Sequence, residues 1–300
     1  MAQSPAHKFG QIIGDVLEEA VEPLLREFAL QHGVYLDRKG PRPARVGRKV
    51  SWKDEFGNTH DLDYVLERGG TAEKIGTPIA FIETAWRRYT KHSRNKAQEI
   101  QGAILPLVAT HRNSAPFIGV ILGGVFTEGA LEQLRSIGFS ILYFPHDHVV
   151  KAFQSVGIDA TFAEDTPDIE LERKVHAWES LPDSQRRLMA HCLIENDRDE
   201  VQRFMLALER AVTRQIESVR ILPLHGAAIE MFLIEEAVEF VRNYDESSAY
   251  RPLARYDIEV HYTNGDSIKA SFDGKESALE FLRGYVSPTF QPTQKVRRQR

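Results

Sequence analysis

The sequence predicts a mixed α/β fold: a mixed β-sheet flanked by helices in the first half, then a mostly helical half that carries a β-hairpin. Apolar side chains recur with helical spacing over residues 9–31, which indicates one broad buried face. Two apolar runs, residues 78–84 and 116–126, are typical of strands within a sheet, and the second has the composition of a strand buried on both faces. Helical patterns alternate with these runs, as in a layered α/β domain.

The first elements follow in chain order. Pro23 predicts a kink in the first helix, or its division into two short helices. Residues 40–49 form a basic loop that begins with Gly and Pro, which break regular structure. Residues 49–54 then alternate, and the turn residues 55–58 precede a strand that begins near His60, so this segment is predicted to be a β-hairpin.

The remaining elements of the first half complete the sheet. A loop over residues 68–77 leads to the strand 78–84, and Ser93 begins a helix that runs through about Thr110 with Pro106 near its end. After the strand within 116–126 come a helix over 128–137 and a strand over 139–144. This order predicts a mixed sheet with helices packed on its faces.

The character of the chain changes after about residue 160, where the segment 163–172 is acidic and rich in turn residues. We therefore expect residues 1–160 to form a core domain and residues 161–300 to form a second region. Helical patterns fill 169–218 and 225–243, and Asn264-Gly265 marks a hairpin over 255–272. A helix over 275–285 precedes a basic tail that is expected to be disordered.

Composition limits the broad class of the protein. The net charge of −5 gives no general support for binding to nucleic acid, so the local clustering of basic residues matters more. The single cysteine, Cys192, excludes an internal disulfide framework and is expected to be a small buried residue. No apolar run reaches membrane length, and the first ten residues lack the apolar core of a signal peptide, so the sequence predicts a cytoplasmic protein with no membrane partner.

Acidic residues near the ends of two neighbouring strands carry the strongest functional signal. Asp61 and Asp63 flank Leu62 ahead of an apolar run, and Glu83 lies near the end of the strand 78–84. Alternation along that strand places Glu83 and Ala85 on one face. Carboxylates at neighbouring strand ends can hold a divalent cation through oxygen ligands.

Asp63, followed by Glu83-Thr84-Ala85, resembles the active-site motif of the PD-(D/E)xK nuclease superfamily, which includes most type II restriction endonucleases. The resemblance covers about half of the chain, and the element order of residues 9–144 is similar to the common core of that family. It implies a Mg²⁺-dependent type II site-specific deoxyribonuclease, a hydrolase of phosphodiester bonds within a restriction system. Asp63, Glu83 and the backbone carbonyl of Thr84 would hold the metal, with Glu19 of the first helix in support. Asp61 is an alternative to Asp63, but the apolar run after Asp63 favours the latter.

The sequence departs from the motif at Ala85, where the family has a lysine that orients the attacking water. A methyl group can neither donate a hydrogen bond nor offset charge, so we expect low or absent activity. Three explanations are open. The chain is a variant inactivated by replacement of lysine, which we favour; or the basic role has moved to Arg88, Lys91 or Lys96; or the protein is a natural pseudo-nuclease that only binds DNA.

A basic cluster follows the second acid directly. We expect its members to contact the DNA backbone: Arg87, Arg88, Lys91, His92, Arg94 and Lys96. The basic loop 38–49 is expected to form a second arm of the same groove, and His60 is a further residue that could reach the site. The resemblance implies double-stranded DNA as substrate, a homodimer, and a cognate DNA methyltransferase in the same system.

Other functions remain open. A repair or defence nuclease of the same fold is one, and a catalytically inactive DNA-binding module, which Ala85 favours, is another. A third is an α/β protein that is not a nuclease, in which the acids and arginines are incidental. The target sequence is not encoded in any local pattern, because base readout depends on side-chain placement in the DNA grooves.

Overall fold

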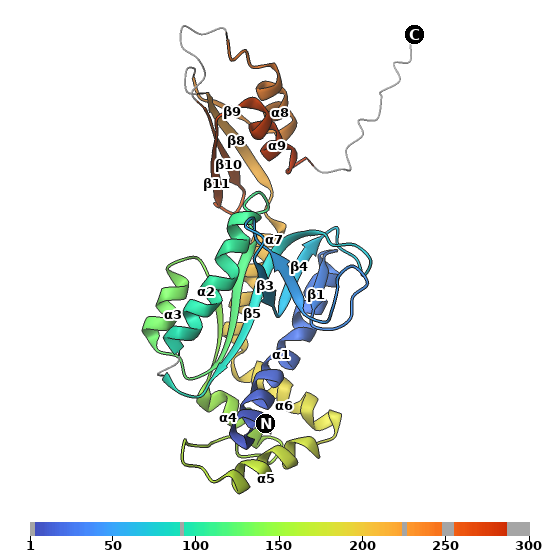
Figure 1. The fold of residues 1–300 in the computed structure, drawn as a ribbon, viewed down its shortest axis with the longest axis vertical. Helices are drawn as coiled ribbons and strands as arrows, with labels where there is room; N and C mark the ends of the chain where they lie inside the picture. Colours follow the sequence, from blue (N-terminus) through green and yellow to red (C-terminus); the bar gives the residue numbers. More distant parts are fainter. Residues whose placement is uncertain (1–3, 91–92, 224–226, 248–254, 287–300) are drawn as a thin grey trace. The chain divides into compact units, whose positions relative to one another are not determined.

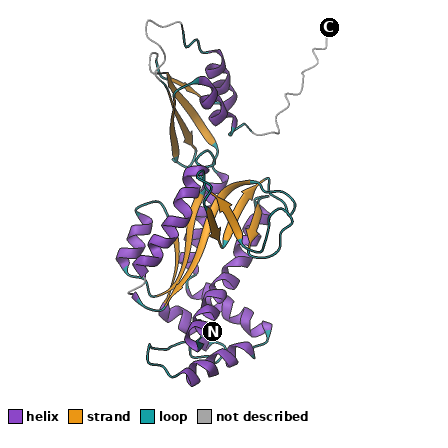
Figure 2. Cartoon of the chain, in the orientation of Figure 1, coloured by secondary structure: helices purple, strands orange, loops and turns teal. Residues whose placement is uncertain are grey.

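The computed structural model describes residues 4–90, 93–223, 227–247 and 255–286. The chain forms two compact units, Met1–Thr213 and Arg214–Arg300, and each is described by itself (Figures 1 and 2). The boundary therefore lies at residues 213 and 214 and not near residue 160. The reason is that Leu171, Phe204 and Val212 are buried in the same hydrophobic cluster as the first helix, so the helices after residue 160 belong to the first unit.

The first unit is built on a five-stranded mixed sheet with the strand order β1-β4-β5-β6-β7. β1, β4 and β5 pair antiparallel, whereas β5, β6 and β7 are parallel. A separate two-stranded hairpin, β2 with β3, precedes β4. The strand bounds are β1 Tyr35–Arg38, β2 Val50–Lys53, β3 Thr59–Leu62, β4 Tyr64–Arg68, β5 Thr77–Arg87, β6 Phe117–Gly124 and β7 Ser140–Pro145. The prediction of a mixed sheet flanked by helices is confirmed.

Helices cover both faces of this sheet (Figure 1). One apolar cluster joins one face to α1 and to α4–α7, and a second joins the other face to α2 and α3. Their bounds are α1 Pro5–Gln31, α2 Ser93–Thr110, α3 Glu128–Arg135, α4 His146–Gln154, α5 Asp168–Glu179, α6 Asp183–Asn196 and α7 Arg198–Thr213. Pro23 lies within α1 and does not divide it.

The second unit is an antiparallel four-stranded sheet with the order β11-β10-β8-β9. Its strands are β8 Ile216–Pro223, β9 Ile229–Met231, β10 Tyr256–Tyr262 and β11 Ser267–Phe272, and its helices are α8 Ile234–Asn243 and α9 Lys275–Arg283. The Asn264-Gly265 hairpin is confirmed, with Gly265 at a φ of 90°, a conformation that favours glycine. The sequence predicted helix as far as residue 218, but β8 already begins at Ile216. The basic tail lies outside the described residues.

Two short elements of the first unit were not predicted, β1 and α4. β1 is four residues long, only one of its side chains is buried, and its sequence shows no alternation of apolar and polar residues. The strand depends on pairing with β4. Within the described ranges, no helix combines the length and the apolar character needed to cross a lipid bilayer.

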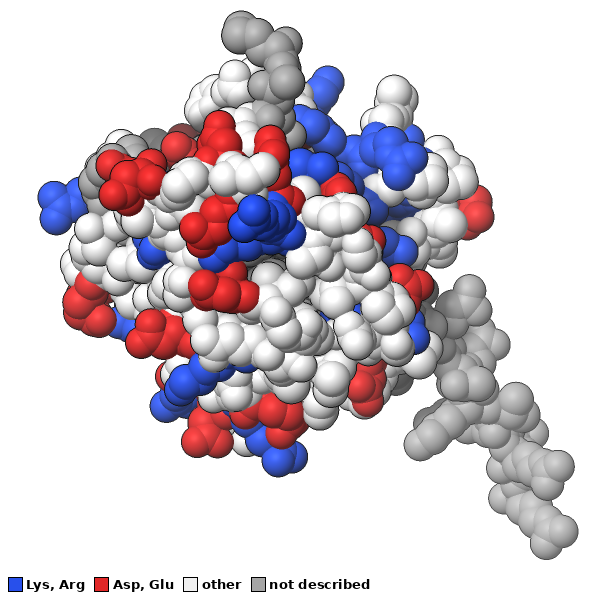
Figure 3. Space-filling view, turned by 90° about the horizontal axis from the view of Figure 1, so that it is seen from below, with Lys and Arg blue, Asp and Glu red and all other residues white. Residues whose placement is uncertain are grey.

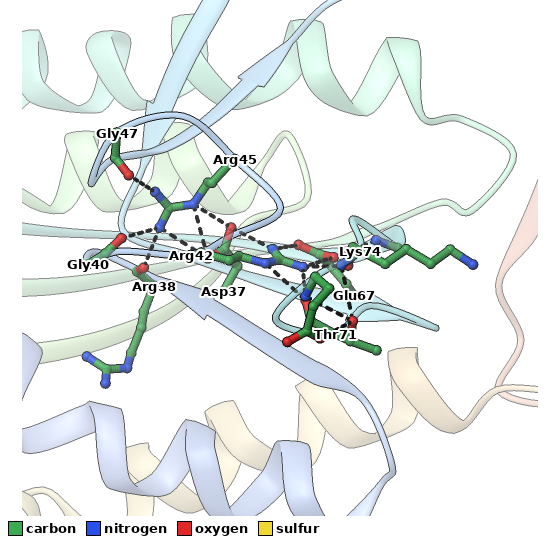
Figure 4. A network of polar contacts seen from close by, with 11 residues as sticks. Asp37, Arg38, Gly40, Arg42, Arg45, Gly47, Glu67, Thr71 and Lys74 are labelled. Carbon is green, nitrogen blue, oxygen red and sulfur yellow. Dashed lines mark hydrogen bonds and ion pairs between the residues drawn. The ribbon is translucent and has the colours of Figure 1, made fainter.

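A buried ion-pair network holds the basic loop 38–49 against the sheet (Figure 4). The two guanidinium nitrogens of Arg42 lie 2.5 and 3.0 Å from the carboxylate oxygens of Glu67, and Nη1 lies 2.9 Å from Asp37. Arg42 also donates to the carbonyls of Thr71 and Lys74, at 2.7 and 2.8 Å. Arg45 binds Asp37 from the other side at 3.1 Å. The expected second DNA-binding arm is therefore corrected in part, because Arg42 and Arg45 serve as internal ties.

Replacing Arg42 by Met should lower the free energy of unfolding of the first unit by about 3–5 kcal/mol, because the buried charge of Glu67 would lose its counter-ion, while Asp37 would keep Arg45 alone. The matched control is Arg38→Met, which removes an exposed arginine paired with Glu22 and should cost less than about 1 kcal/mol. Urea unfolding followed by tryptophan fluorescence reports this unit alone, since Trp52, Trp86 and Trp178 all lie in it. Equal losses in the two variants would contradict the prediction.

Candidate functional site

The site lies where β5 extends beyond its neighbour β4. The pairing of these strands ends with Tyr64 opposite Ile82, whereas β6 continues to pair with β5 as far as Arg87. Asp63 directly precedes the first paired residue, so it lies level with Glu83. Its Oδ2 accepts hydrogen bonds from the Thr84 backbone N–H at 2.7 Å and from the Thr84 hydroxyl at 2.6 Å. The structure thus brings together Asp63, Glu83 and Thr84, which the sequence selected.

The first helix brings a third carboxylate to this position, and it is Glu18. Burial, with the nearby charge of Asp63, raises the pKa of Glu18 to about 7, while Lys39 and Thr84 oppose that rise. The Tyr64 hydroxyl donates to the Glu18 carbonyl at 3.0 Å and so fixes α1 against β4.

Glu19, the residue that the sequence selected from this helix, faces elsewhere. One residue along a helix turns the side chain by about 100°, and Glu19 lies in the field of Arg186 and Asp183 of α6. The selection of Glu19 is therefore corrected to Glu18. Helical periodicity placed Glu19 at the border of the apolar stripe and Glu18 further round, whereas in the structure Glu18 is half-buried and Glu19 is exposed.

Glu83 is the most deeply buried of the three acids, with 9% of its surface exposed. Burial and then the charge of Asp63 raise the pKa of Glu83 to about 8, and Lys96 acts in the opposite direction. Because strand side chains alternate, Glu83 shares the α2 side of the sheet with Ala85, while Thr84 lies on the α1 side. Crowded carboxylates with raised pKa values favour a bound proton or cation over the bare charged state.

The choice between Asp61 and Asp63 follows from their partners. Asp61 lies on the β2–β3 hairpin, where Lys49 Nζ and Ser51 Oγ each bind it at 2.6 Å, and these bonds lower its pKa. Its charge is thus already matched, whereas Asp63 forms no ion pair with any residue that the structure describes. His60 bonds Asp54 at 2.9 Å within the same hairpin and does not join the acids.

The three carboxylates offer oxygen ligands, which hard divalent cations prefer. Both hydrogen bonds that the structure gives Asp63 are accepted by its Oδ2 atom. Among the described residues, no three His, Cys, Asp or Glu side chains are arranged around a common point suitable for a metal ion. Binding of a cation would therefore draw the three acids closer together than they now lie.

Ala85, where the resemblance led us to expect a lysine, is 6% exposed. It packs in the apolar cluster on the α2 side together with Ala97, and it also lines an open cavity beside Lys96. Lys96 lies in the first turns of α2 and pairs with Glu99 at 3.5 Å.

The basic cluster after β5 is not uniformly exposed. Arg87 donates to the Trp86 carbonyl at 2.9 Å, and Arg88 bonds the carbonyl of Phe162. Arg94 is exposed at the start of α2, and the predicted contacts Lys91 and His92 lie outside the described residues. In Figure 3, Lys and Arg side chains gather at one edge of the face shown, while Asp and Glu side chains are spread over much of the rest.

Comparison with known proteins gives little context. No protein-family model matches the chain, and no curated protein matches it. Among solved structures, a crystal structure of AF1548, described as a protein of unknown function, aligns at 11% sequence identity. The alignment covers 63% of this chain and 98% of the other, with a TM-score of 0.29.

The raised pKa of Glu83 predicts a pH dependence of stability. The folded state holds a proton that the unfolded state has lost between about pH 4.5 and pH 8, so the free energy of unfolding should fall as pH rises through this range. Glu83→Gln removes the part of the decline due to Glu83, while Glu18, whose pKa is also raised, keeps its own part. The variant should stabilise the metal-free first unit by on the order of 2–4 kcal/mol at pH 9, with little effect at pH 5.

Asp61→Asn is the control with the opposite sign. The pKa of Asp61 is lowered, so its loss should cost a few tenths of a kcal/mol at pH 7. Urea unfolding by tryptophan fluorescence, in EDTA at pH 5, 7 and 9, measures both. Destabilisation of Glu83→Gln at pH 9 would contradict the assignment.

Proposed function

We propose that the chain is a Mg²⁺-dependent DNA endonuclease that hydrolyses phosphodiester bonds. The observation that carries this proposal is that Glu18 and Glu83 lie near Asp63, where β5 extends beyond β4, so that the charge of Asp63 helps to raise the pKa of both glutamates. The three acids come from a helix, a strand junction and a strand, so the arrangement depends on the tertiary fold. A structural role would favour paired acids, as in the Asp37 and Glu67 network, rather than carboxylates that repel one another.

The chemistry assigns a role to each residue. Asp63, Glu83 and the Thr84 carbonyl would hold Mg²⁺, which offsets charge on the phosphate and lowers the pKa of a water molecule. Thr84 fixes the orientation of Asp63 through two hydrogen bonds to one oxygen. Glu18 adds a third carboxylate from the opposite side of β5, next to Lys39.

Lys96 is the residue best suited to replace the missing lysine at position 85. It is the cation that lowers the pKa of Glu83, and it lines the same cavity as Ala85. Its position in the first turns of an 18-residue helix adds the favourable field of the helix N-terminus toward a phosphate. In this role Lys96 would orient the attacking water and stabilise developing negative charge.

The proposal extends to a type II restriction enzyme that acts on double-stranded DNA as a homodimer. The basic residues Arg87, Arg94 and Lys96 support contact with the phosphate backbone. The second unit, with its own sheet and core, would supply target recognition or contacts between copies. A catalytically inactive DNA-binding module is the second candidate, and Ala85 is the observation that favours it.

Cleavage assays on Lys96 and Ala85 variants test the proposal. We expect weak Mg²⁺-dependent cleavage of DNA by the chain, a further loss of about 10²-fold in Lys96→Ala, and a gain of at least tenfold in Ala85→Lys. Lys151→Ala, which removes an exposed cation of α4 away from the proposed DNA contacts, should retain cleavage within a few-fold.

Discrete DNA fragments would indicate a sequence-specific enzyme, and a smear would indicate a nonspecific one. Absence of cleavage by every variant, Ala85→Lys included, together with intact DNA binding would contradict the nuclease and leave the binding module. Activity confined to Ala85→Lys would retain the nuclease and remove Lys96 from its role.

A further inference from the structure

An open cavity of about 650 Å³ adjoins the acidic site within the first unit. Its walls come from the first turns of α1, the end of β5 with the residues that follow it, and the loop 162–168. The volume falls within the range of about 300–1,000 Å³ that is usual for small-ligand pockets. Thr84, which binds Asp63, lines the cavity together with Ala85 and Lys96, whereas the three carboxylates lie outside its lining.

Two glycines of α1 keep this space open. Gly10 and Gly14 both line the cavity, and a Cβ atom added at either would meet no atom within 4 Å. Glycine in a helix interior is destabilising relative to alanine, and neither packing nor a positive φ requires it here. The residues 10, 14 and 18 are spaced by four, so they form one row on the helix, and the row leads from the cavity to Glu18.

The opposite wall is aromatic and cationic. Trp86, Tyr89 and Phe162 line the cavity, and the Arg88 guanidinium lies 5.1 Å from the Phe162 ring and 5.4 Å from the Tyr89 ring. Trp86 is fixed from behind by His146, whose ring is stacked at 6.0 Å. Arg88 Nε is buried and makes no hydrogen bond within the described part of the chain.

We propose that this cavity receives one unstacked nucleotide of the DNA whose phosphate lies at the acidic site. The inference rests on the proposed function and adds to it a substrate that is locally unpaired. Aromatic rings and an arginine plane offer stacking surfaces for a base of any sequence. Gln11 and His7, one turn apart on α1, supply polar groups at the rim.

The shape of the cavity favours a single nucleotide over other parts of DNA. A paired duplex is too wide to enter a space of this volume, whereas its backbone can lie across the acids outside. The wall carries three cations, Arg87, Arg88 and Lys96, which match the phosphate attached to the inserted base. Two acids, Glu164 and Asp168, also line the cavity, so the cations outnumber them.

Fluorescence anisotropy with three short labelled DNAs of one sequence tests the proposal, with Ca²⁺ in place of Mg²⁺ to prevent cleavage. The first DNA is fully paired, the second carries one extra unpaired nucleotide, and the third carries an abasic residue in that place. Because an unpaired nucleotide avoids an unstacking cost of a few kcal/mol, the second should bind at least about tenfold more tightly than the first. The third should lose that gain, since it has no base to insert.

A Cβ atom at position 14 meets no atom within 4 Å, so the side chain of Gly14→Leu would occupy part of the cavity. This variant should abolish the preference while leaving affinity for paired DNA within about twofold. Gly102→Leu is the matched control, because Gly102 is an exposed glycine of α2 that also has nothing within 4 Å and does not line the cavity. It should retain the preference. The urea midpoint by tryptophan fluorescence verifies that both variants fold.

Equal binding of all three DNAs by the wild-type chain, or an unchanged preference in Gly14→Leu, would overturn the inference alone. Failure to bind any of the three would overturn the proposed function with it. A preference for the unpaired nucleotide that Gly14→Leu removes and Gly102→Leu keeps would establish the cavity as the site of insertion.

Discussion

The end of backbone pairing between β4 and β5 is the constraint on which the candidate site depends. Since the last pair is Tyr64 with Ile82, the residue before β4 lies beside the free end of β5. Asp63 occupies that position and is held by two hydrogen bonds from Thr84. The buried Tyr64 side chain donates a hydrogen bond to the Glu18 carbonyl and so holds α1 beside this end of β4. One short strand thus sets the positions of all three acids.

The same strand is anchored at its other end by the buried ion network. Glu67 is fully buried and binds Arg42 with both carboxylate oxygens, and it also accepts a hydrogen bond from the Gly76 N–H at 2.6 Å. A buried pair of this kind adds little net stability over an apolar packing, but loss of either partner is costly. The contrast between the two ends of β4 is informative. Charges are fully matched around Glu67, whereas the acids near Asp63 repel one another, which is the arrangement expected where a cation is bound.

Much of the fold could be predicted from local patterns. The bounds of α2, the Asn264-Gly265 hairpin and the shared face of Glu83 and Ala85 follow from periodicity and turn chemistry, which depend on near neighbours in the sequence. Other features depend on partners distant in the chain. The rotation that selects Glu18 over Glu19 is set by the packing of α1. The acidic segment 163–172 has the composition of a linker, yet Leu171 is buried with the core. Arg42 belongs to a basic run in the sequence, and only the fold shows that its guanidinium group forms ion pairs with the buried carboxylates of Asp37 and Glu67.

The central claim is that Asp63 and Glu83 hold a divalent cation at the end of β5. Anomalous diffraction from crystals soaked in Mn²⁺ tests it most directly, because the ion is located without any assumption about substrate or activity. We predict one strong anomalous peak about 2.0–2.6 Å from oxygens of Asp63 and Glu83, with Glu18 close by and no peak at Asp61. A peak elsewhere in the molecule, or no peak at these carboxylates at saturating Mn²⁺, would contradict the claim.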